Sequence, residues 1–519
     1  MKNNILCATL GLLGLLAVGP TLRATAADFN ITDYGASGDG RTLATAAIQR
    51  TIDACAAAGG GRVVLPAGTF LSGPVFLKSH VELHLSPGAV LAGTEDFSAY
   101  PIIRGRWEGI ERDIHASLIT ALDAENVSVT GSGTIDGRGA PWWAAARATR
   151  QLRRDRGIEG REPPDPPGAP LAYPRPRLVY LQNCRNVRLI GFTAINSPSW
   201  TIHPVYCDDV VIDGLTLLAP EDSPNTDGID PDSCRNVRIS NCRISCGDDA
   251  IIIKSGYNED GRRVDRICEN IVITNCVIGS GVAAIGIGSE TSGGVRNVTV
   301  SNCVFENTEY GLRVKSARGR GAVVENFRAS NIVMRNIKEI ALSITTYYDN
   351  RARTPQPADV TTPTFRNFEW SNVIIEGTDQ VAMIDGLPEQ MLEGISLDRV
   401  TVRGAARGIS ATLVDGLNLT NWDLDVAKGP ALQVAQSRAL ELAAIKVRHP
   451  SPDSPVISLT DVAGAHIREC HAADGTTVFL QLTGPGNRNI VLQSNHLASA
   501  SQPTALADGA RPDVLTILP

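Results

Sequence analysis

The stretch RNVRISNCRI at residues 235–244 contains the pattern that decides the fold. Asn236 precedes a short alternating segment, Val237-Arg238-Ile239, and a polar corner then leads into a second one, Cys242-Arg243-Ile244. Alternation with a period of two places every second side chain on the same face of a strand. Each half of the stretch therefore predicts a short strand with one buried face.

The same sequence motif recurs along the chain. An Asn or Asp followed by a hydrophobic residue recurs at intervals of 23, 27, 34, 27 and 29 residues, at Asn186-Val187, Asp209-Val210, Asn236-Val237, Asn270-Ile271, Asn297-Val298 and Asn326-Phe327. Strands of three to five residues, separated by Gly, Asn and Ser corners and repeated about every 25 residues, are typical of a parallel β-helix. A (β/α)8 barrel would need amphipathic helices between the strands, which we do not find. We therefore expect an all-β, single-stranded solenoid.

The composition suits a folded solenoid and argues against two classes of protein. Hydrophobic residues make up 43% of the 519 residues, which excludes intrinsic disorder. The 48 basic and 55 acidic residues give a net charge of −7 without a stripe of Lys and Arg, which argues against a nucleic-acid-binding protein. An acidic protein that binds an anionic ligand needs a local basic site for it.

We expect three segments along the chain. Residues 1–26 have the features of a secretory signal peptide: Lys2, an apolar run from Ile5 to Val18, and the small-residue site Ala24-Thr25-Ala26. The protein should therefore be exported, to the periplasm or outside the cell, with no membrane segment after cleavage. Residues 27–379 are expected to form a catalytic β-helix and residues 380–519 a structural continuation of it.

Two segments should lie outside the coils. A short amphipathic helix between Ala44 and Ala58 is expected to cap the first coil and its open strand edges. Residues 144–176 interrupt the repeats with arginines and then prolines. We interpret them as a long ordered loop folded over one side of the solenoid, with a flexible linker as the alternative.

The 11 cysteines would suggest disulfides in an exported protein. Cys242, Cys276 and Cys303, however, each follow an Asn at the same position of successive repeats. We therefore interpret them as a column of small core side chains, with disulfide bridging as the alternative.

The clearest chemistry lies between residues 225 and 315. Asp227 ends one predicted strand and Asp248-Asp249 follows about one coil later, so these carboxylates should lie on adjacent coils about 4.8 Å apart. Arg313 and Lys315 lie two coils further on, and the single residue between them places both cations on one side of their strand. Three acids beside two cations suit the cleavage of an acidic sugar polymer. In inverting glycosidases the carboxyl group that protonates the leaving oxygen and the carboxylate that holds the water are roughly 6.5–9.5 Å apart.

Crowded carboxylates also raise one another's pKa, which can keep one of them protonated near neutral pH. Two other interpretations of the cluster stay open. Acidic residues at the corners of a β-helix can merely satisfy backbone amides. With Asp230 and Asp232 close by, the cluster could also bind calcium, although these two residues share a strand parity that Asp227 does not have.

These motifs resemble glycoside hydrolase family 28, the polygalacturonases. The resemblance runs from about Asp33 to Tyr348, and it is carried by Asp33-Tyr34-Gly35-Ala36, residues 38–40, residues 59–66, residues 197–204 and the run from Asn225 to Gly256. It implies a right-handed parallel β-helix and inverting hydrolysis that needs no metal or organic cofactor. Residues 107–109 (Trp-Glu-Gly) and 134–137 (Thr-Ile-Asp-Gly) resemble the bacterial and plant-like branch, in which exo-acting members are common.

The resemblance also implies roles for individual residues. Asp248 would be the general acid, and Asp227 and Asp249 would hold and activate the attacking water. Arg313 and Lys315 would bind a galacturonate carboxylate.

Three further residues would complete the substrate site by the same resemblance. They are Asn225, His203 and either Tyr347 or Tyr348. For His203, a histidine bonded to the backbone is the alternative.

One position departs from the family. A Gly-His-Gly segment usually precedes Ile-Gly-Ser, and here it falls on Val282-Ala283-Ala284, so that alanine, or valine after a shift of one residue, replaces the histidine. Neither side chain can donate a hydrogen bond to a sugar hydroxyl. The loss should weaken the transition-state interaction by about 1–3 kcal/mol. We favour an active enzyme with altered specificity over an inactive one.

Our first hypothesis is an exported, exo-acting, monomeric hydrolase of α-linked galacturonides in pectin, an acidic plant cell-wall polysaccharide. The loops around Arg104–Glu111 and 144–176 would then close one end of the groove. The alternatives are a hydrolase of rhamnogalacturonan or another decorated uronide, a calcium-dependent pectate lyase, and a pectin-binding solenoid without turnover.

Overall fold

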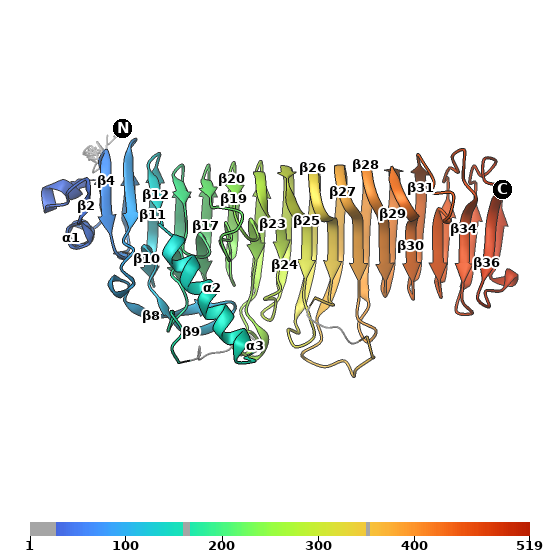
Figure 1. The fold of residues 1–519 in the computed structure, drawn as a ribbon, viewed down its shortest axis with the longest axis horizontal. Helices are drawn as coiled ribbons and strands as arrows, with labels where there is room; N and C mark the ends of the chain where they lie inside the picture. Colours follow the sequence, from blue (N-terminus) through green and yellow to red (C-terminus); the bar gives the residue numbers. More distant parts are fainter. Residues whose placement is uncertain (1–26, 159–166, 349–352) are drawn as a thin grey trace, which may run out of the picture.

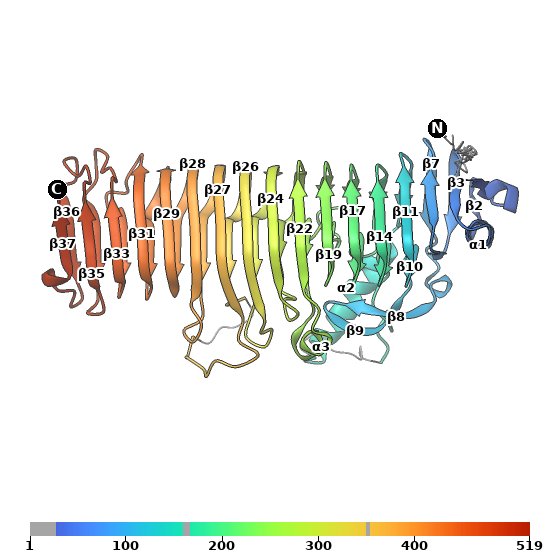
Figure 2. The same cartoon turned by 180° about the vertical axis from the view of Figure 1, so that it is seen from behind.

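Successive turns of the chain stack on one another, so that each strand pairs in parallel with a strand of the coil before and of the coil after (Figure 1). The computed structural model describes residues 27–158, 167–348 and 353–519. From β1 (Asp28–Asn30) to β37 (Leu515–Leu518) they form the predicted right-handed parallel β-helix, seen from both sides in Figures 1 and 2. The predicted signal peptide, residues 1–26, lies outside the described residues.

Three parallel ladders run along the solenoid. The first ladder contains, after β1, the strands β3 (Gly61–Leu65), β6 (Val81–Leu85), β11 (Glu125–Gly131), β14 (Arg185–Ile190), β17 (Asp208–Asp213), β19 (Arg235–Ser240), β22 (Cys268–Thr274), β24 (Val295–Glu306), β26 (Val323–Thr345), β27 (Thr364–Asp385), β28 (Leu392–Thr412), β29 (Val414–Leu424), β31 (Arg438–Val447), β33 (Ala463–Arg468), β35 (Arg488–Gln493) and β37.

The second ladder begins beside the first. It contains β2 (Asp39–Leu43), β4 (Gly68–Ser72), β7 (Ala89–Gly93), β12 (Thr134–Asp136), β15 (Thr193–Ile195), β18 (Thr216–Leu218), β20 (Arg243–Ser245) and the first part of β23 (Val277–Ile287).

The third ladder carries the candidate site. It contains β5 (Val75–Leu77), β10 (Ile119–Leu122), β13 (Val179–Gln182), β16 (Ile202–Val205), β21 (Ile251–Ile253), the end of β23, β25 (Thr308–Lys315), the ends of β26, β27 and β28, and then β30 (Val426–Ala435), β32 (Ile457–Thr460), β34 (Val478–Thr483) and β36 (Gln502–Ala507).

The corner asparagines explain the repeated phrase. Asn236, Asn270, Asn297 and Asn326 all have φ between 56° and 59°, the left-handed region that asparagine tolerates better than most residues. Their side chains form a ladder of their own, in which the amides of Asn270, Asn297 and Asn326 each donate to the amide oxygen of the asparagine one coil earlier at 3.1 Å. A single left-handed residue thus makes the corner and links it to the neighbouring coils.

The later coils differ from the expected strands of three to five residues. β26 runs for 23 residues and β27 for 22, whereas the strands before β22 have three to seven. The parallel pairing of β26 with β27 continues on both sides of the corner asparagines Asn331 and Asn336. Because each corner takes only one left-handed residue, one strand passes through several corners.

The interior is one continuous hydrophobic cluster that extends from Ile31 to Val514. The described cysteines are free and buried, as the column interpretation predicted. Cys242, Cys276 and Cys303 are 1–2% exposed, and each thiol donates to the backbone carbonyl two residues earlier. They act as small core residues.

The N-terminal end is covered by the predicted helix. Helix α1 (Thr45–Ala57) buries Ile48, Ile52 and Cys55 completely against the first coils, so the apolar stripe found in the sequence is its inner face. The short 3-10 helices are η1 (Ile31–Tyr34), η2 (Phe97–Ala99) and η3 (Pro512–Val514).

The prediction of a loop at residues 144–176 was wrong for residues 144–155, because they belong to helix α2 (Ala140–Asp155). Pro141 occupies the first turn, alanines follow, and basic residues end the helix, an arrangement that favours an α-helix. Trp142 anchors it, because its ring is fully buried and stacks on Phe97 at 3.7 Å. Residues 159–166 lie outside the described residues.

The insertions gather on one side of the N-terminal half of the solenoid. These are α2, α3 (Asn258–Val264) and the antiparallel hairpin of β8 (Ile102–Trp107) and β9 (Ile110–His115), as both ribbon views show. None of the helices in the described residues has the length and apolar character needed to cross a membrane.

Candidate active site

The third ladder brings the three predicted acids together. Ile229 pairs with Ile251, so Asp227 and Asp249, each two residues earlier, come to adjacent coils. One carboxylate oxygen each of Asp227, Asp248 and Asp249 lies within 4.8 Å of the other two. The predicted adjacency is confirmed, but the carboxylates are closer than the separation of roughly 6.5–9.5 Å expected for an inverting pair.

Asp249 is the carboxylate held in its ionised form. Lys315 Nζ donates to its Oδ2 at 2.8 Å, and the backbone N–H of Ala283 donates to its Oδ1 at 3.0 Å. Burial raises the pKa of Asp249, but the positive charges of Lys315, Arg313 and Lys254 outweigh it, so that the pKa falls below its ordinary value.

The pKa of Asp248 is shifted in the opposite direction to that of Asp249. Burial, followed by the charge of Asp249, raises the pKa of Asp248 from 3.8 to about 6, although Lys315 and Lys254 oppose the shift. Asn225 Nδ2 approaches its Oδ2 at 3.4 Å, and the backbone N–H of Asp249 donates to its Oδ1 at 2.9 Å. At weakly acidic pH the pair therefore offers one proton donor and one carboxylate.

Asp227 belongs to a buried network around Lys254. The Lys254 ammonium lies 3.6 Å from Asp227, 3.5 Å from Asp230 and 3.5 Å from Glu290, and 4.4 Å above the Trp200 ring. Burial and the neighbouring Asp248 and Asp230 raise the pKa of Asp227 well above its usual range.

Sequence reasoning missed Lys254 and Glu290 as site residues. Both line the cavity of about 120 Å³ that contains the three aspartates. Lys254 lies inside the run from Asn225 to Gly256 that carries the family resemblance, which was an available signal. Glu290 only follows the Ile-Gly-Ser segment, and its approach to Lys254 depends on the stacking of coils.

The pairing of the acids does not favour the calcium interpretation. Asp232 is bound by Arg106 at 2.9 Å and Asp230 faces Lys254, so neither is left for a metal shared with the cluster. The ammonium groups of Lys315 and Lys254 lie against Asp249 and Asp227. Side chains of the chain thus supply the positive charge that a cation would bring.

The two predicted cations lie on one side of their strand, as expected. Lys315 lines the cavity, and its Nζ lies 5.3 Å from the centre of the Tyr348 ring. The Arg313 guanidinium lies 5.4 Å from the centre of the same ring and 3.6 Å from that of Tyr310, and Arg313 is not part of the cavity lining.

Of the two tyrosine candidates only one lines the cavity, and the predicted histidine does not line it. Tyr348 lines the cavity, whereas Tyr347 packs against Arg353 at 4.5 Å and is not part of the lining. The expectation that His203 lines the pocket was wrong, and so was the backbone-bonded alternative. His203 is fully buried, with Nε2 3.7 Å from Asp232 Oδ2 and its ring against the edge of Trp200.

The segment that lacks the family histidine lies behind the carboxylates. Ala283 is fully buried and contributes its backbone N–H to Asp249, while Val282 is half-buried. Neither residue lines the cavity.

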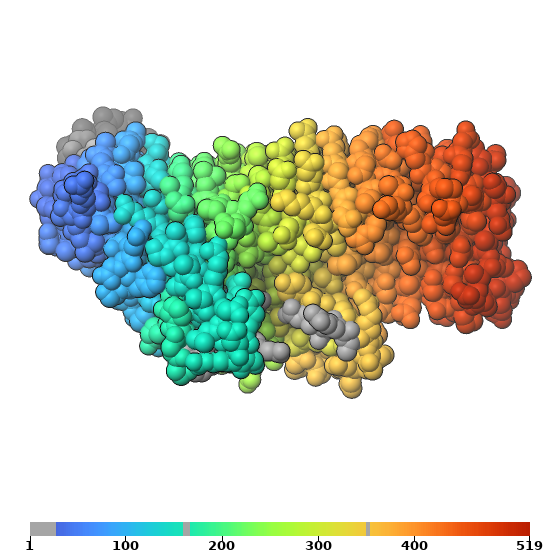
Figure 3. All heavy atoms as spheres, viewed as in Figure 1, coloured from blue at the N-terminus to red at the C-terminus, as the bar shows by residue number. Residues whose placement is uncertain are grey.

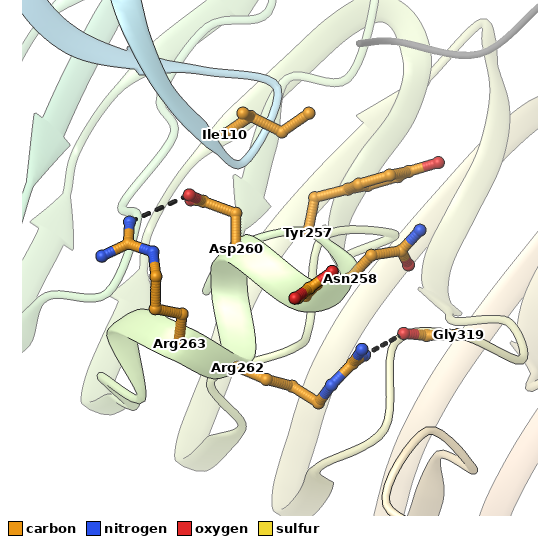
Figure 4. A pocket seen from close by; sticks show the side chains of 8 residues that line it. Ile110, Tyr257, Asn258, Asp260, Arg262, Arg263 and Gly319 are labelled. Atoms are coloured by element: carbon orange, nitrogen blue, oxygen red, sulfur yellow. Dashed lines mark hydrogen bonds and ion pairs between the residues drawn. The ribbon is translucent and has the colours of Figure 1, made fainter.

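A larger cavity of about 560 Å³ lies beside α3 (Figure 4). Arg262 donates to the carbonyl of Gly319, and Arg263 forms an ion pair with Asp260 at 2.9 Å. Arg263 and Asp260 thus pair with each other, and the cavity contains none of the predicted site residues.

Comparison with known proteins agrees with this geometry. The pattern described as "Glycosyl hydrolases family 28" matches residues 171–415. A "Probable polygalacturonase" of Vitis vinifera is 34% identical over 388 residues, which cover 73% of this chain and 74% of the relative. An "Endo-polygalacturonase" of Pectobacterium carotovorum subsp. carotovorum is 31% identical, with 69% of this chain and 87% of the relative covered.

The chain belongs to glycosyl hydrolases family 28. It is therefore a glycoside hydrolase. Among solved structures it is similar to an exopolygalacturonase of Thermotoga maritima, with a TM-score of 0.66, 33% identity, and 74% of this chain and 90% of that chain covered. Residues 29–149 of this family 28 chain also match a pattern described as "Rhamnogalacturonase A/epimerase, pectate lyase-like".

Proposed function

We propose that the protein is an exported, exo-acting, inverting hydrolase that cleaves α-linked galacturonic acid residues of pectin as a monomer without a cofactor. The observation that carries the proposal is the cluster of three carboxylates in one cavity with Lys315 and Lys254. Acids and cations so close together suit a substrate that is both a glycoside and an anion.

The acids divide the chemistry between them. Asp248, whose pKa is raised to about 6, donates its proton to the glycosidic oxygen as the bond to the anomeric carbon breaks. Asp249, kept ionised by Lys315, accepts a proton from the water that forms the new bond to that carbon. Asp227 holds this water from the adjacent coil. The products are two sugars, and the proton balance of the pair is restored through solvent.

Arg313 and Lys315 would recognise the uronate. Arg313 and Lys315 project to the same side, beside Tyr348, where a carboxylate of the substrate would meet both. The names of the relatives, polygalacturonase and exopolygalacturonase, support a galacturonate.

Exo action is supported by the insertions on the N-terminal side of the cluster. Glu108, in the turn of the β8–β9 hairpin, lines the cavity, and α2 lies next to it. These elements add walls to a groove that a bare solenoid would leave open.

Inversion is inferred from the protonation of the carboxylates and not from their spacing. Carboxylates within 4.8 Å of one another are also close enough for a retaining mechanism, in which the two groups are roughly 5–5.5 Å apart. Inversion is supported by the opposite pKa shifts of Asp248 and Asp249 and by the family resemblance. A water held between Asp227 and the ionised Asp249 would separate Asp249 from the anomeric carbon, so that Asp249 acts as a base and not as the nucleophile.

The test compares the wild-type protein with Asp248→Asn on polygalacturonate in EDTA. We expect reducing ends to appear with little early loss of viscosity, because an exo-acting enzyme shortens chains from one end. The variant should lose about 10²- to 10⁴-fold in kcat, as expected when a general acid is removed, while it still binds the polymer. Equal activity of the two proteins would contradict the assignment of Asp248, and binding without turnover by the wild type would identify a pectin-binding solenoid.

A second candidate is hydrolysis of rhamnogalacturonan or another decorated uronide. It is favoured by the replacement of the histidine at Val282-Ala283 and by the match of residues 29–149. Hydrolysis of rhamnogalacturonan fragments at a rate above that of oligogalacturonates would select it.

A further inference from the structure

A second cavity adjoins the carboxylate cluster on its N-terminal side. It has a volume of about 220 Å³ and shares Asn225 and Glu108 with the catalytic cavity. We call it the arginine recess, because it is lined by Arg112, Arg150, Arg153 and Arg175 together with Thr149 and Trp107. Helix α2 forms one wall and stands out from the body of the solenoid in Figure 3.

Two of these arginines converge on one neutral oxygen. Arg150 and Arg175 both donate to Oδ1 of Asn225, at 3.1 Å and 2.9 Å. Burial and the charge of Arg150 lower the pKa of Arg175 to about 10. Glu108 also lines the recess, and its charge and that of Asp227 oppose this lowering of the Arg175 pKa. Two guanidinium groups that share one neutral acceptor still leave N–H donors that suit an anionic ligand.

Two polar groups of the recess have hydrogen-bonding atoms that remain available to a ligand. The Thr149 hydroxyl is buried, with the residue 7% exposed, and within the described part of the chain it has no hydrogen-bond partner. Within the described residues, the exposed Arg150 donates a hydrogen bond only to Asn225, so the rest of its guanidinium can bind a ligand. A buried hydroxyl beside an arginine fork matches a sugar carboxylate with neighbouring hydroxyls.

The recess and the Arg313–Lys315 pair lie on opposite sides of the carboxylates. Ile229, Ile251, Ile285 and Leu312 are successive partners in the third ladder, so three steps of about 4.8 Å separate the coil of Asn225 from that of Arg313. A chain that places its scissile bond at the carboxylates therefore has cations on both sides of that bond.

We propose that the arginine recess is a second uronate subsite, in which Arg150, Arg175 and Thr149 bind the carboxylate of the terminal sugar ring across the scissile bond from Arg313 and Lys315. This inference rests on the proposed function. It makes the enzyme selective for a charged terminal ring, and Asn225 connects the occupied recess to Asp248 through its amide.

The test measures kcat and KM for Arg150→Gln with three trimers: trigalacturonate, and trigalacturonate with the carboxyl group of one or the other terminal ring reduced to an alcohol. Arg147→Gln is the matched control, because Arg147 is an exposed arginine of the same helix that contacts Asp222 outside the recess. We expect the wild type to lose about 10- to 100-fold in kcat/KM on one of the two reduced trimers, the effect of a charge-assisted hydrogen bond.

Arg150→Gln should raise KM for trigalacturonate by a similar factor and no longer distinguish that trimer from the intact one, whereas Arg147→Gln behaves like the wild type. Thr149→Val should act in the same direction. The proposal is overturned if Arg150→Gln keeps the wild-type discrimination, or if it lowers kcat alone, since Arg150 would then act only through Asn225.

A wild-type protein that does not hydrolyse trigalacturonate would refute the proposed function instead. Calorimetric titration of trigalacturonate into Asp248→Asn and into Asp248→Asn with Arg150→Gln would then decide the recess separately. Binding weakened by about 10-fold or more supports the subsite, and equal binding overturns it.

Discussion

Replacing Asp248 by asparagine should lower kcat by about 10²- to 10⁴-fold and stabilise the fold at the same time. Asp248 has a pKa of about 6 in the folded protein, against an ordinary value of 3.8, because it is buried beside Asp249. The folded state therefore holds the proton of Asp248 more tightly than the unfolded state does. Ionised Asp248 destabilises the fold at pH values above about 6, and this penalty vanishes below the ordinary pKa of 3.8.

The magnitude follows from the two pKa values. A difference of about 2.2, at about 1.36 kcal/mol for each pKa unit, is about 3 kcal/mol at pH 7.5 and less than about 1 kcal/mol at pH 4. A chain of this length has an unfolding entropy of about 1 kcal/mol/K, so 3 kcal/mol corresponds to a rise of about 3 °C in Tm.

The assay is thermal melting of the wild type, Asp248→Asn and Asp249→Asn at pH 7.5 and pH 4. Asp249→Asn is the matched control, because the pKa of Asp249 is lowered and its charge is bound by Lys315. Its ionised form contributes stability above the ordinary pKa, which is lost as the pH falls. At pH 7.5 the two variants should therefore melt on opposite sides of the wild type, Asp248→Asn higher and Asp249→Asn lower.

The reasoning is refuted if Asp248→Asn melts below the wild type at pH 7.5, or if both variants shift in the same direction. Either result would mean that the cluster does not shift the pKa values of Asp248 and Asp249 in opposite directions.

Three further outcomes follow from the same contacts. First, kcat/KM of the wild type should fall about tenfold per pH unit above pH 6, as Asp248 loses its proton, which a pH–rate profile on oligogalacturonate measures. Second, Lys315→Met removes the cation 2.8 Å from Asp249, so kcat/KM should fall by about 10- to 100-fold and the acidic limb of the profile should move to higher pH; an unchanged limb would show that Lys315 does not set the charge of Asp249. Third, Asn297→Ala should lower Tm by about 1–2 °C because alanine is unfavourable at φ 56°, whereas Asn297→Gly should recover the backbone part of the loss, and equal melting of the two variants would argue against strain at the corner.

The β-helix could be predicted because one residue type, asparagine, recurs at the corner of successive coils. A corner that takes one left-handed residue selects Asn repeatedly, as at Asn236, Asn270 and Asn297, and the hydrophobic residue that follows begins a buried strand. The same periodicity placed Asp227 and Asp249 on adjacent coils. Helix α2 interrupts that periodicity, and its own signals, Pro141 and the alanines after it, did not lead to the prediction of a helix.

The parts of the site that could not be predicted depend on contacts between insertions and coils. His203 lies beside Asp232, which also binds Arg106 of β8. The β8–β9 hairpin therefore covers His203, and the histidine does not reach the cavity. Lys254 and Glu290 meet because two coils stack, although 36 residues separate them in the chain. Arg150 reaches Asn225 from α2 over 75 residues. Contacts between residues so far apart in the chain leave no local pattern in the sequence.

The most direct test of the account follows the digestion of trigalacturonate by proton NMR in EDTA and records the first anomer that forms at the new reducing end. The account predicts the β-anomer, released by hydrolysis at Asp248 and Asp249 and then equilibrating slowly with the α-anomer. First appearance of the α-anomer would contradict inversion and point to a nucleophilic carboxylate, and an unsaturated product would contradict hydrolysis itself.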